Sequence, residues 1–383
     1  METEKLYYHD PFLREFVATV LSCEETKKGY TVTLDRSAFY PEGGGQPADH
    51  GTLDGIAVTD VHEKDGVILH TCAAPLECGK TVTGVIDWAR RFDHMQQHSG
   101  EHIISGILCA DYHCDNVGFH LGADTVTIDY NTDISWEQAL AAEAKANAVI
   151  WADQAVQITY PDKAELAALD YRSKKELEGQ VRIVTFPEAD CCACCGTHVL
   201  RAGQVGLVKV LSCQKFRDGV RMEILCGGRA LTYLGKTYEQ ARAIGQALSV
   251  KPQDTLAAVE RMAAELNAAK ARCAALESEV FESIASRCEG QGDMVLFQDP
   301  MKPDSVRKLA DAVAHTCGGL ATVFAGPEEG KWNYAMVRTD GTDISAFVKE
   351  MNKALNGRGG GRNGFAQGSV QTDRAAIEAF FDL

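Results

Sequence analysis

Two short segments, far apart in the chain, carry side chains that commonly bind metal ions. His98 and His102 lie four residues apart on a predicted helix, so both imidazoles face the same side, one turn apart. The second segment supplies Cys194 and His198 in the pattern C-x-x-x-H. Neither pair is specific alone, but together they offer three nitrogens and one sulfur, a tetrahedral set suited to Zn²⁺. A fold that uses this set must bring the two segments together.

The second segment reads CCACCGTH over 191–198, so other thiols compete with Cys194. The chain has 14 cysteines scattered over 383 residues, and its start lacks the apolar stretch of a signal peptide, which favours reduced thiols over disulfides. Cys195 is an alternative ligand in place of Cys194. Cys191 and Cys192 are expected to pack within the fold. The alternative is that they bind the metal together with Cys194 in a pattern of the C-x-x-C type.

A third histidine, His94, precedes His98 by one further helical turn. A metal site made of His94, His98 and His102 is geometrically awkward, because a straight helix carries the first and third of these about 12 Å apart. We therefore interpret His94 as a residue that supports the ligands or faces the substrate, with a solvated histidine as the alternative.

The formal net charge of −16 argues against a general binder of polyanions. A local basic strip can still act by itself, because charges are screened over a Debye length of ~8 Å. Any nucleic-acid contact is therefore expected at a few concentrated Arg and Lys sites. No run approaches the ~18 apolar residues that a membrane span requires, so we expect a cytoplasmic protein without membrane contact.

Changes in hydrophobic periodicity divide the chain into four predicted domains of an α+β protein. Residues 1–87 alternate apolar and polar positions between turns rich in Gly, Asp and Pro, which predicts a small antiparallel β-barrel. Residues 88–231 mix helical and strand patterns around both metal-binding segments and form an α+β domain. Residues 232–290 are helical, and residues 291–383 alternate strands with helices in an α/β domain.

A long helix is predicted over roughly 254–288. Apolar residues recur along it in alternating steps of three and four from Val259 to Val280, which is a heptad pattern. Two interpretations fit this pattern equally well. The helix packs within its own domain, or the chain forms a homodimer through this helix and the C-terminal domain.

The predicted barrel contains the stretch FYPEGGGQPADHG (39–51), which is too rich in glycine for an ordinary hairpin. Gly43, Gly44 and Gly45 would let the backbone approach a ligand closely and offer N–H groups to an oxyanion or a carbonyl oxygen. A tight, bulged hairpin is the structural alternative.

A second glycine-rich stretch, ALNGRGGGRNGFAQGSV (354–370), lies near the end of the chain. A loop here would let Arg358 and Arg362 reach phosphates over the bare backbone of Gly359, Gly360 and Gly361. A plain mobile turn is the alternative.

Taken together, these motifs resemble one family. His98-Ser-Gly-Glu-His102 is similar to the HTxxH element, and Cys194-Cys-Gly-Thr-His198 to the CGGTH element, of the alanyl-tRNA synthetase editing domain and its freestanding relatives, the AlaX proteins. FYPEGGGQPADHG resembles the glycine-rich signature that precedes this domain, and NGRGGGRNGFAQGS the C-terminal motif of the synthetase. The motifs occur in the family order over residues 35–370, without an upstream aminoacylation domain. This is the pattern of the long AlaX type.

The resemblance implies an aminoacyl-tRNA deacylase that acts in trans with one Zn²⁺ per chain. Its substrate would be tRNA(Ala) wrongly charged with serine, and secondly with glycine. Because serine is larger than alanine, a site that admits serine cannot exclude alanine by size. The site must therefore contain a buried polar group that the serine hydroxyl satisfies and that is left unpaired when alanine is bound. Candidates for reading the hydroxyl are Ser37, Thr197, the metal and, as first choice, Gln46.

Two mechanisms are compatible with four protein ligands. The zinc activates a water molecule, or it only orients the aminoacyl group; we favour the second. The chain departs from the family pattern at Ser37 and Ser99, where threonine is usual, at Cys195, where glycine is usual, and at Asn363, where proline is usual. The change at Asn363 weakens the expectation of RNA binding slightly.

Three other functions compete with this interpretation. A phosphoesterase of the DHH type would need an Asp-His-His motif, and the nearest match is Asp93-His94-Met95. A non-catalytic tRNA-binding protein could hold the same zinc for structural reasons. A deacylase of another amino-acid specificity could share the fold.

Overall fold

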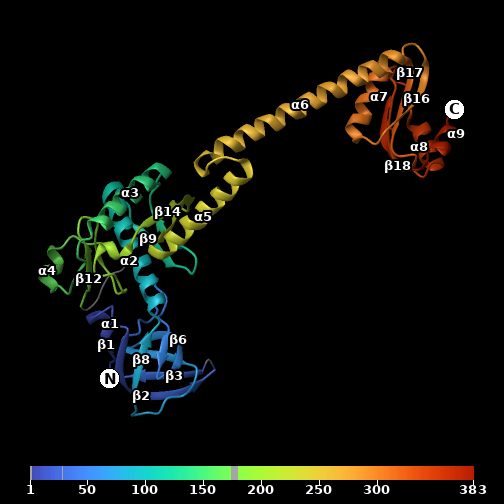
Figure 1. Ribbon diagram of the computed structural model, residues 1–383. Coiled ribbons are helices and arrows are strands. Elements are labelled where there is room, and N and C mark those ends of the chain that lie inside the picture. Colours follow the sequence, from blue (N-terminus) through green and yellow to red (C-terminus); the bar gives the residue numbers. More distant parts are fainter. Residues whose placement is uncertain (1, 28, 174–179) are drawn as a thin grey trace. The chain divides into compact units, whose positions relative to one another are not determined.

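The computed structural model describes residues 2–27, 29–173 and 180–383. Within these residues the chain divides into two compact units, Met1–Ile244 and Gly245–Leu383, and each is described by itself (Figure 1). Helices and mostly antiparallel sheets occur in both units, which confirms the predicted mixed α+β class. The division into four domains stays a prediction, and its first two segments lie within the first unit.

Six antiparallel strands near the N-terminus close into a barrel. Buried and more accessible side chains alternate along the strands, so that one face of each strand fills the interior with apolar groups. In their order around the barrel, the strands are β2 (Glu15–Thr26), β3 (Gly29–Leu34), β7 (Val67–Cys72), β6 (Ile56–Lys64), β5 (Gly51–Leu53) and β8 (Thr81–Ile86).

A short N-terminal segment is tied to the barrel. Strand β1 (Glu4–Lys5) pairs in parallel with β4 (Arg36–Ser37), and α1 (Leu6–His9) follows it directly. Tyr7 of α1 is buried, and its ring lies edge-on to that of Tyr40.

Helix α2 (Trp88–Tyr112) begins where the barrel ends and includes the helix predicted from residue 88. The Asp87 side chain caps its N-terminus by accepting a hydrogen bond from the Arg90 backbone N–H, and His113 ends it in the left-handed conformation. Every residue from Gln97 to Leu108 is buried. The helix therefore runs through the interior of the first unit, where polar side chains need partners.

A buried ion pair joins α2 to the barrel. Arg91 and Asp49 are both fully buried, and the guanidinium contacts both carboxylate oxygens of Asp49. The same guanidinium donates hydrogen bonds to the backbone carbonyls of Pro11 (2.9 Å) and Ala38 (2.5 Å). One side chain thus fixes three segments of the barrel region to the start of the helix.

A four-stranded antiparallel sheet packs against α2 and against helix α3 (Trp136–Ala152). Ser135 caps α3 in a capping box with Gln138, so the predicted N-cap is confirmed. Apolar residues of both helices and of the sheet form one core. In sheet order, the strands are β14 (Val208–Phe216), β15 (Gly219–Cys226), β10 (Val126–Tyr130) and β9 (Asn116–Leu121).

A smaller antiparallel sheet carries the cysteine-rich segment. Its strands, in sheet order, are β11 (Gln157–Thr159), β12 (Ile183–Phe186) and β13 (Asp190–Ala193), and α4 (Lys163–Ala168) lies between β11 and β12 in the chain. Strand β13 ends directly before Cys194, so the second metal-binding segment is a loop at the end of this strand. Helix α5 (Gly227–Leu248) follows β15.

The second unit contains helix α6 (Thr255–Arg287) and a five-stranded sheet with helices α7 (Pro303–Cys317), α8 (Ser345–Ala354) and α9 (Arg374–Phe380). Two apolar clusters are built on this sheet, one with α7 and the other with α8 and α9. The strands, in sheet order, are β16 (Gly292–Gln298), β17 (Gly318–Ala325), β18 (Glu329–Val337), β20 (Phe365–Asp373) and β19 (Arg358–Arg362).

The prediction of a glycine-rich loop around Arg358 was wrong in one respect, because Arg358–Arg362 forms the edge strand β19. Its glycines permit a close approach to β20. A Cβ atom on Gly361 would lie 1.9 Å from the Phe365 carbonyl oxygen, and one on Gly359 would lie 2.5 Å from the Gln367 carbonyl oxygen. Both arginines at the ends of the strand are exposed.

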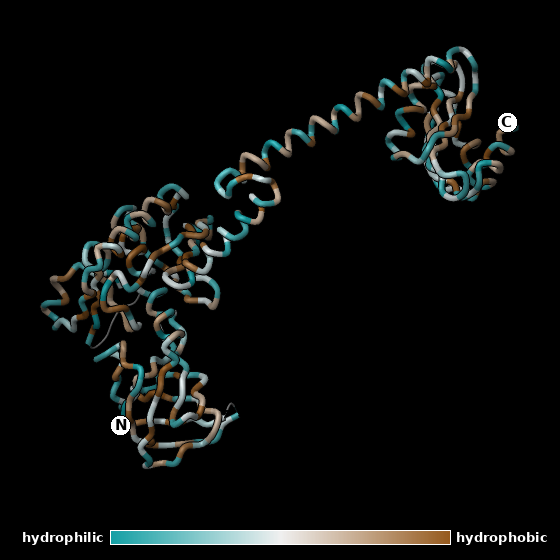
Figure 2. The backbone as a smooth tube through the Cα atoms, viewed as in Figure 1, coloured by the Kyte–Doolittle hydropathy of each residue, from teal (hydrophilic) through white to brown (hydrophobic). Residues whose placement is uncertain are grey.

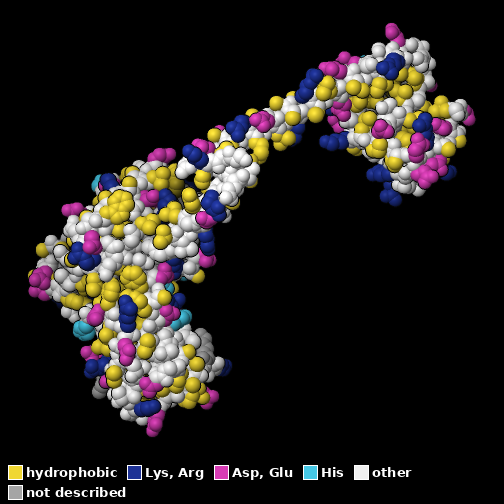
Figure 3. Space-filling model, viewed as in Figure 1, with side chains coloured by type: hydrophobic (Ala, Val, Ile, Leu, Met, Phe, Trp, Pro, Cys, Tyr) yellow, Lys and Arg dark blue, Asp and Glu magenta, His cyan; other side chains and the backbone are white. Residues whose placement is uncertain are grey.

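Most of the apolar seam of α6 is exposed. Only Ala258, Phe281 and Ala285 of this helix are buried among the described residues. Figure 2 shows hydrophobic and hydrophilic residues alternating along the helix, and Figure 3 shows hydrophobic side chains on its surface. The homodimer through α6 stays a prediction.

None of the helices in the described parts of the chain is long and apolar enough to cross a membrane.

A candidate metal centre and its cavity

The structure brings the two metal-binding segments together. The donor atoms of His98, His102, Cys194 and His198 all lie within 4.8 Å of one another. Two of these side chains come from successive turns of α2, and two come from the loop after β13. All three histidines are almost completely buried.

The donor atoms have the spacing of a tetrahedral site. Cys194 Sγ lies 3.5 Å from His98 Nε2 and 3.3 Å from His198 Nε2. Usual Zn–S and Zn–N bond lengths in a tetrahedron place sulfur and nitrogen about 3.5 Å apart. The residues therefore fit a zinc ion in both chemistry and spacing.

Each histidine is oriented through its Nδ1 atom, which leaves Nε2 to face the cluster. Such partners fix the ring and its tautomer, and losing one typically weakens metal binding 10- to 100-fold, roughly. The three contacts are His98 Nδ1 to Gln46 Oε1 (2.8 Å), His102 Nδ1 to Asp190 Oδ2 (2.8 Å) and His198 Nδ1 to Ser99 Oγ (3.1 Å).

Gln46 reaches the cluster from the glycine-rich turn. The backbones of Gly43 and Gln46 exchange hydrogen bonds around Gly44 and Gly45, both of which have positive φ, as in a two-residue turn of type I′. The buried Gln46 amide also donates to Thr197 Oγ1 (2.8 Å) and accepts from the Thr197 N–H (3.3 Å). Gln46 thus fixes both a metal ligand and the loop that carries two others.

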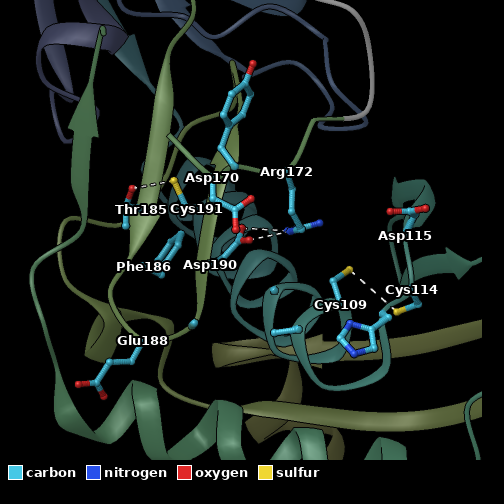
Figure 4. A pocket seen from close by; sticks show the side chains of 15 residues that line it. Cys109, Cys114, Asp115, Asp170, Arg172, Thr185, Phe186, Glu188, Asp190 and Cys191 are labelled. Atoms are coloured by element: carbon cyan, nitrogen blue, oxygen red, sulfur yellow. Dashed lines mark hydrogen bonds and ion pairs between the residues drawn. The ribbon is translucent and has the colours of Figure 1, made fainter. Parts of the chain in front are cut away.

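Asp190 holds His102 from β13 and is itself held by an arginine. Arg172 donates two hydrogen bonds to the Asp190 carboxylate, at 2.7 and 2.9 Å, as the dashed lines in Figure 4 show. The pair lies in the wall of a separate cavity of about 590 Å³. A bidentate partner fixes the direction of this buried carboxylate toward the His102 ring.

The loop that carries Cys194 is clamped by Arg182, which is nearly buried. Its guanidinium donates to the carbonyl oxygens of Cys194 (2.7 Å) and Gly196 (3.0 Å), and it lies over the ring of Tyr8 at 5.2 Å. Gly196 is needed for a steric reason, because a Cβ atom there would lie 2.2 Å from the His98 ring.

The protein surroundings stabilise a thiolate at Cys194. Burial alone would raise the pKa of this thiol, but the three neighbouring imidazoles lower it well below its usual range. Burial also opposes a charge on His102, yet Cys194 and Asp190 raise the pKa of His102 to about 10. Burial lowers the pKa of His198 to about 3. The Cys194 thiolate and the neutral His198 ring are forms that bind metal, and metal binding would release the proton of His102.

A cavity of about 520 Å³ opens beside the cluster. Three of the four donor residues, His98, His102 and Cys194, line it. The glycine turn and Phe119 of β9 form part of its wall, and a Cβ atom on Gly45 would lie 2.6 Å from the Phe119 ring. The His98 ring stacks on Phe119 with centroids 4.9 Å apart. A small ligand in this cavity would contact the cluster.

Three family models match separate parts of the chain. Residues 4–90 match the model described as tRNA synthetases class II (A), and residues 181–221 match the threonyl and alanyl tRNA synthetase second additional domain. Residues 285–383 match the DHHA1 domain. The second match covers the loop with Cys194 and His198.

Curated relatives extend the similarity over the whole length. The alanyl-tRNA editing protein AlaX-L of Pyrococcus horikoshii is 31% identical over 399 residues, covering 99% of this chain and 97% of that protein. The chain belongs to the alanyl-tRNA editing protein family. The alanine–tRNA ligase of Halorubrum lacusprofundi is 33% identical and that of Pyrococcus abyssi 31%, over 96% and 99% of this chain. The chain spans 42% and 43% of these two ligases.

A solved structure of the C-Ala domain of Aquifex aeolicus alanyl-tRNA synthetase is 24% identical and covers 24% of this chain and 94% of that domain. Its TM-score of 0.20 is too low to carry an argument about the fold.

The geometry of the donor cluster in this editing protein favours Cys194 over Cys195 as the sulfur ligand. Cys195 is exposed and is not part of the donor cluster. Cys192 is buried and lies near His102 and Asp190, whereas Cys191 accepts a hydrogen bond from Thr185 at 3.5 Å. Metal binding by Cys191 and Cys194 in a C-x-x-C pattern lacks support, because Cys191 is in none of the donor groups found among the described residues.

The residues expected to bind substrate in this editing protein divide into two groups. Gly44 and Gly45 line the cavity beside the cluster. Ser37, Gln46, Thr197 and His94 are buried and are not among the described residues that line it. Ser37 instead bonds His70 Nε2 at 2.8 Å inside the barrel. Their roles in substrate binding stay predictions.

His94 lies one turn before the cluster. Its Nδ1 atom has no partner in the described part of the chain, and burial, together with Arg90 and Arg229, lowers the pKa of its ring to about 3. The neighbouring Asp93 carboxylate is bound by Arg229 at 2.8 and 3.0 Å. Asp93-His94-Met95 therefore offers no ready metal site of the phosphoesterase kind.

The sequence of this editing protein did not reveal the side chains that hold the metal ligands in place. These are Asp190, Arg172 and Arg182, and none of them occupies a position in the motifs. Only the Asp directly before the cysteine run was a visible signal for one of them.

Proposed function

We propose that this editing protein hydrolyses the ester bond that joins a wrongly attached amino acid to tRNA(Ala), with serine as the main substrate and glycine as a second. The observation that carries the proposal is the four-donor cluster in the wall of a cavity of about 520 Å³, in a chain of the alanyl-tRNA editing family. The cavity is large enough for an aminoacyl group with part of its terminal ribose.

The bound cofactor in this proposal is one zinc ion per chain, held by His98, His102, Cys194 and His198. When bound, it would supply Lewis-acid polarisation and orientation of the aminoacyl group. The protein supplies fixed geometry. Gln46, Ser99 and Asp190 hold the three rings, and the turn at Gly44 and Gly45 closes the cavity against Phe119. Such preorganisation stabilises a transition state without reorganisation during the reaction.

Selection against alanine requires a polar group that only the serine hydroxyl satisfies. The alanyl ester is spared in this proposal because its methyl group would cover that polar group without satisfying it. The glycyl ester has no side chain to cover the group, so it is accepted as the slower second substrate. Ser37, Gln46, Thr197 and the metal remain the proposed candidates for this selection.

The test is deacylation of Ser-, Gly- and Ala-tRNA(Ala) by the purified chain, before and after treatment with a zinc chelator. We expect rapid loss of the seryl ester, slower loss of the glycyl ester and at least about 100-fold slower loss of the alanyl ester, since a missing hydrogen bond in a buried polar site gives discrimination of this order or more. Chelation should abolish the reaction, and added Zn²⁺ should restore it. Equal hydrolysis of all three esters would contradict a proofreading role.

For tRNA binding we propose the exposed ends of β19. Arg358 and Arg362 project from an edge strand whose centre is three glycines, so phosphates can approach the strand closely. The two arginines concentrate positive charge at one place on a protein with a net charge of −16.

Replacing both Arg358 and Arg362 with alanine should weaken tRNA binding at least tenfold and reduce the slope of log K against log salt by about 2, because two phosphate contacts are lost. Filter binding over a range of salt concentrations measures both quantities. A matched control replaces Arg307 and Lys308 of α7, which pair with Asp304. If both double variants behave alike, β19 is an ordinary edge strand.

A further inference from the structure

Two cysteine thiols face each other in the wall of the separate cavity beside Asp190. Cys109 lies near the end of α2, and Cys114 follows the end of that helix, two residues before β9. Their Sγ atoms are 4.0 Å apart, and Figure 4 shows the two side chains pointing toward each other. Both residues line the cavity of about 590 Å³. Neither belongs to a metal-donor group found among the described residues, so the pair is separate from the metal centre.

The two thiols differ in their surroundings. Cys109 is partly accessible, whereas Cys114 is buried. The hydrogen bond from Cys114 lowers the pKa of Cys109 more than burial raises it, and Arg172 lowers it further. The same hydrogen bond, together with burial, raises the pKa of Cys114 far above its usual range. Cys109 is therefore the thiol of the pair that ionises first.

A partly accessible thiol that ionises readily, with a second thiol beside it, is typical of redox-active cysteine pairs. A disulfide needs an S–S distance of about 2.05 Å, so each sulfur has to move by only about 1 Å. Cys114 lies beyond the end of α2, so its side chain can rotate without disturbing the helix. All 14 cysteines of the chain are free, so the structure shows the reduced form of the pair.

The cavity gives a small molecule a path to Cys109, and its wall is acidic. Its basic side chains among the described residues are His113 and Arg172, and Arg172 donates two hydrogen bonds to Asp190. Three further carboxylates line the wall, namely Asp115, Asp170 and Glu188. A wall of this kind raises the local concentration of cationic molecules over anionic ones.

We propose that Cys109 and Cys114 form a redox-active dithiol, which low-molecular-weight disulfides that enter the cavity, above all cationic ones, oxidise to a disulfide. The Cys109 thiolate attacks one sulfur of the reagent, the S–S bond of the reagent breaks, and the first thiol leaves with the proton that Cys109 lost. Cys114 then attacks the Cys109 sulfur of the mixed disulfide, and the second thiol leaves with the proton of Cys114. Two protein thiols are oxidised to one disulfide, and the reagent is reduced to two thiols.

The test exposes the chain, loaded with Zn²⁺, to cystamine, a small cationic disulfide, and then blocks the remaining thiols with an alkylating reagent. Asp111 lies between the two cysteines, so a protease that cleaves before aspartate separates them unless a disulfide joins their peptides. Mass spectrometry should find the two peptides joined, and dithiothreitol should release them. Cys109 should react at least about 10-fold faster than Cys213, a partly buried thiol whose pKa is raised by burial.

Serine variants separate the roles of the two thiols. Cys114→Ser keeps the attacking thiol and lacks the second one, so it should accumulate the mixed disulfide of Cys109. Cys109→Ser should leave Cys114 almost unreacted, because that thiol is buried. The matched control is Cys191→Ser, which removes another thiol from the wall of the same cavity and should not alter disulfide formation.

A second reagent tests the route through the acidic cavity. Glutathione disulfide carries a net negative charge, so the ratio of its rate to that of cystamine should be lower at Cys109 than at Cys78, which is exposed. The exposed thiol thereby corrects for the different intrinsic reactivities of the two reagents.

Three results, all obtained with the wild-type chain, would overturn the inference. A reaction at Cys109 that stops at the mixed disulfide would show that the two sulfurs cannot meet. Equal rates at Cys109 and Cys213 would show that Cys109 is not activated. Equal rate ratios for the two reagents at Cys109 and Cys78 would contradict entry through the cavity. None of these measurements uses deacylation, so the outcome is independent of the proposed function.

Discussion

Replacing Cys194 with alanine is expected to empty the metal centre and abolish deacylation. Cys194 is the only sulfur in the four-donor cluster, and three imidazoles converge on it. Its loss leaves only three imidazole ligands, and a missing ligand should cost more than the roughly 10- to 100-fold lost with an outer partner. We expect less than about 0.1 zinc per chain after dialysis and a fall in kcat/KM on Ser-tRNA(Ala) of at least about 1000-fold.

The matched control is Cys195→Ala, which removes the exposed thiol next in sequence. This variant should keep its zinc and its activity. Metal analysis of both dialysed proteins and a deacylation assay show whether Cys194 or Cys195 is the sulfur ligand. Full zinc in Cys194→Ala together with loss of zinc in Cys195→Ala would reverse the assignment of the ligand.

The second large effect is expected at the buried ion pair between Arg91 and Asp49. Replacing Arg91 with methionine leaves the Asp49 carboxylate buried without its cation, and the carbonyls of Pro11 and Ala38 lose a donor. Breaking such a pair typically costs about 3–5 kcal/mol. Urea unfolding followed by tryptophan fluorescence should show this loss, since Trp88 lies one helical turn from Arg91.

Arg242→Met provides the comparison, because Arg242 forms an exposed ion pair with Glu239 in the same unit. Exposed pairs contribute about 0–1 kcal/mol, so this variant should unfold almost as the wild type does. A loss below about 1 kcal/mol in Arg91→Met would show that the pair does not hold the barrel to α2.

Local patterns predicted the parts of the fold that depend on neighbouring residues. The helical period after Asp87 predicted α2, and Ser135 marked the start of α3. The spacing of His98 and His102 on one helix, and of Cys194 and His198 in one loop, also follows from short stretches of sequence. Such signals need only the backbone geometry of one element.

The partners of the ligands depend on contacts between distant elements, which spacing cannot show. His98 meets Gln46 from the barrel turn, and His102 meets Asp190 from β13. The role of Gln46 in reading the substrate hydroxyl stays a prediction, and its bonds to His98 and Thr197 could not be foreseen from the sequence. The strand at Arg358 was hidden for a similar reason, because only pairing with β20 makes glycines fit there.

The contact between Gln46 and His98 limits how such proteins can be recombined during evolution. A gene fusion that kept residues 88 onward would encode all four donors, but it would remove the partner of His98 Nδ1 and of the Thr197 hydroxyl. The four ligands alone are therefore not sufficient to transfer the complete metal site to another protein. A segment that keeps all four donors and the partner of His98 must include the barrel turn with Gln46 as well as residues 88–198.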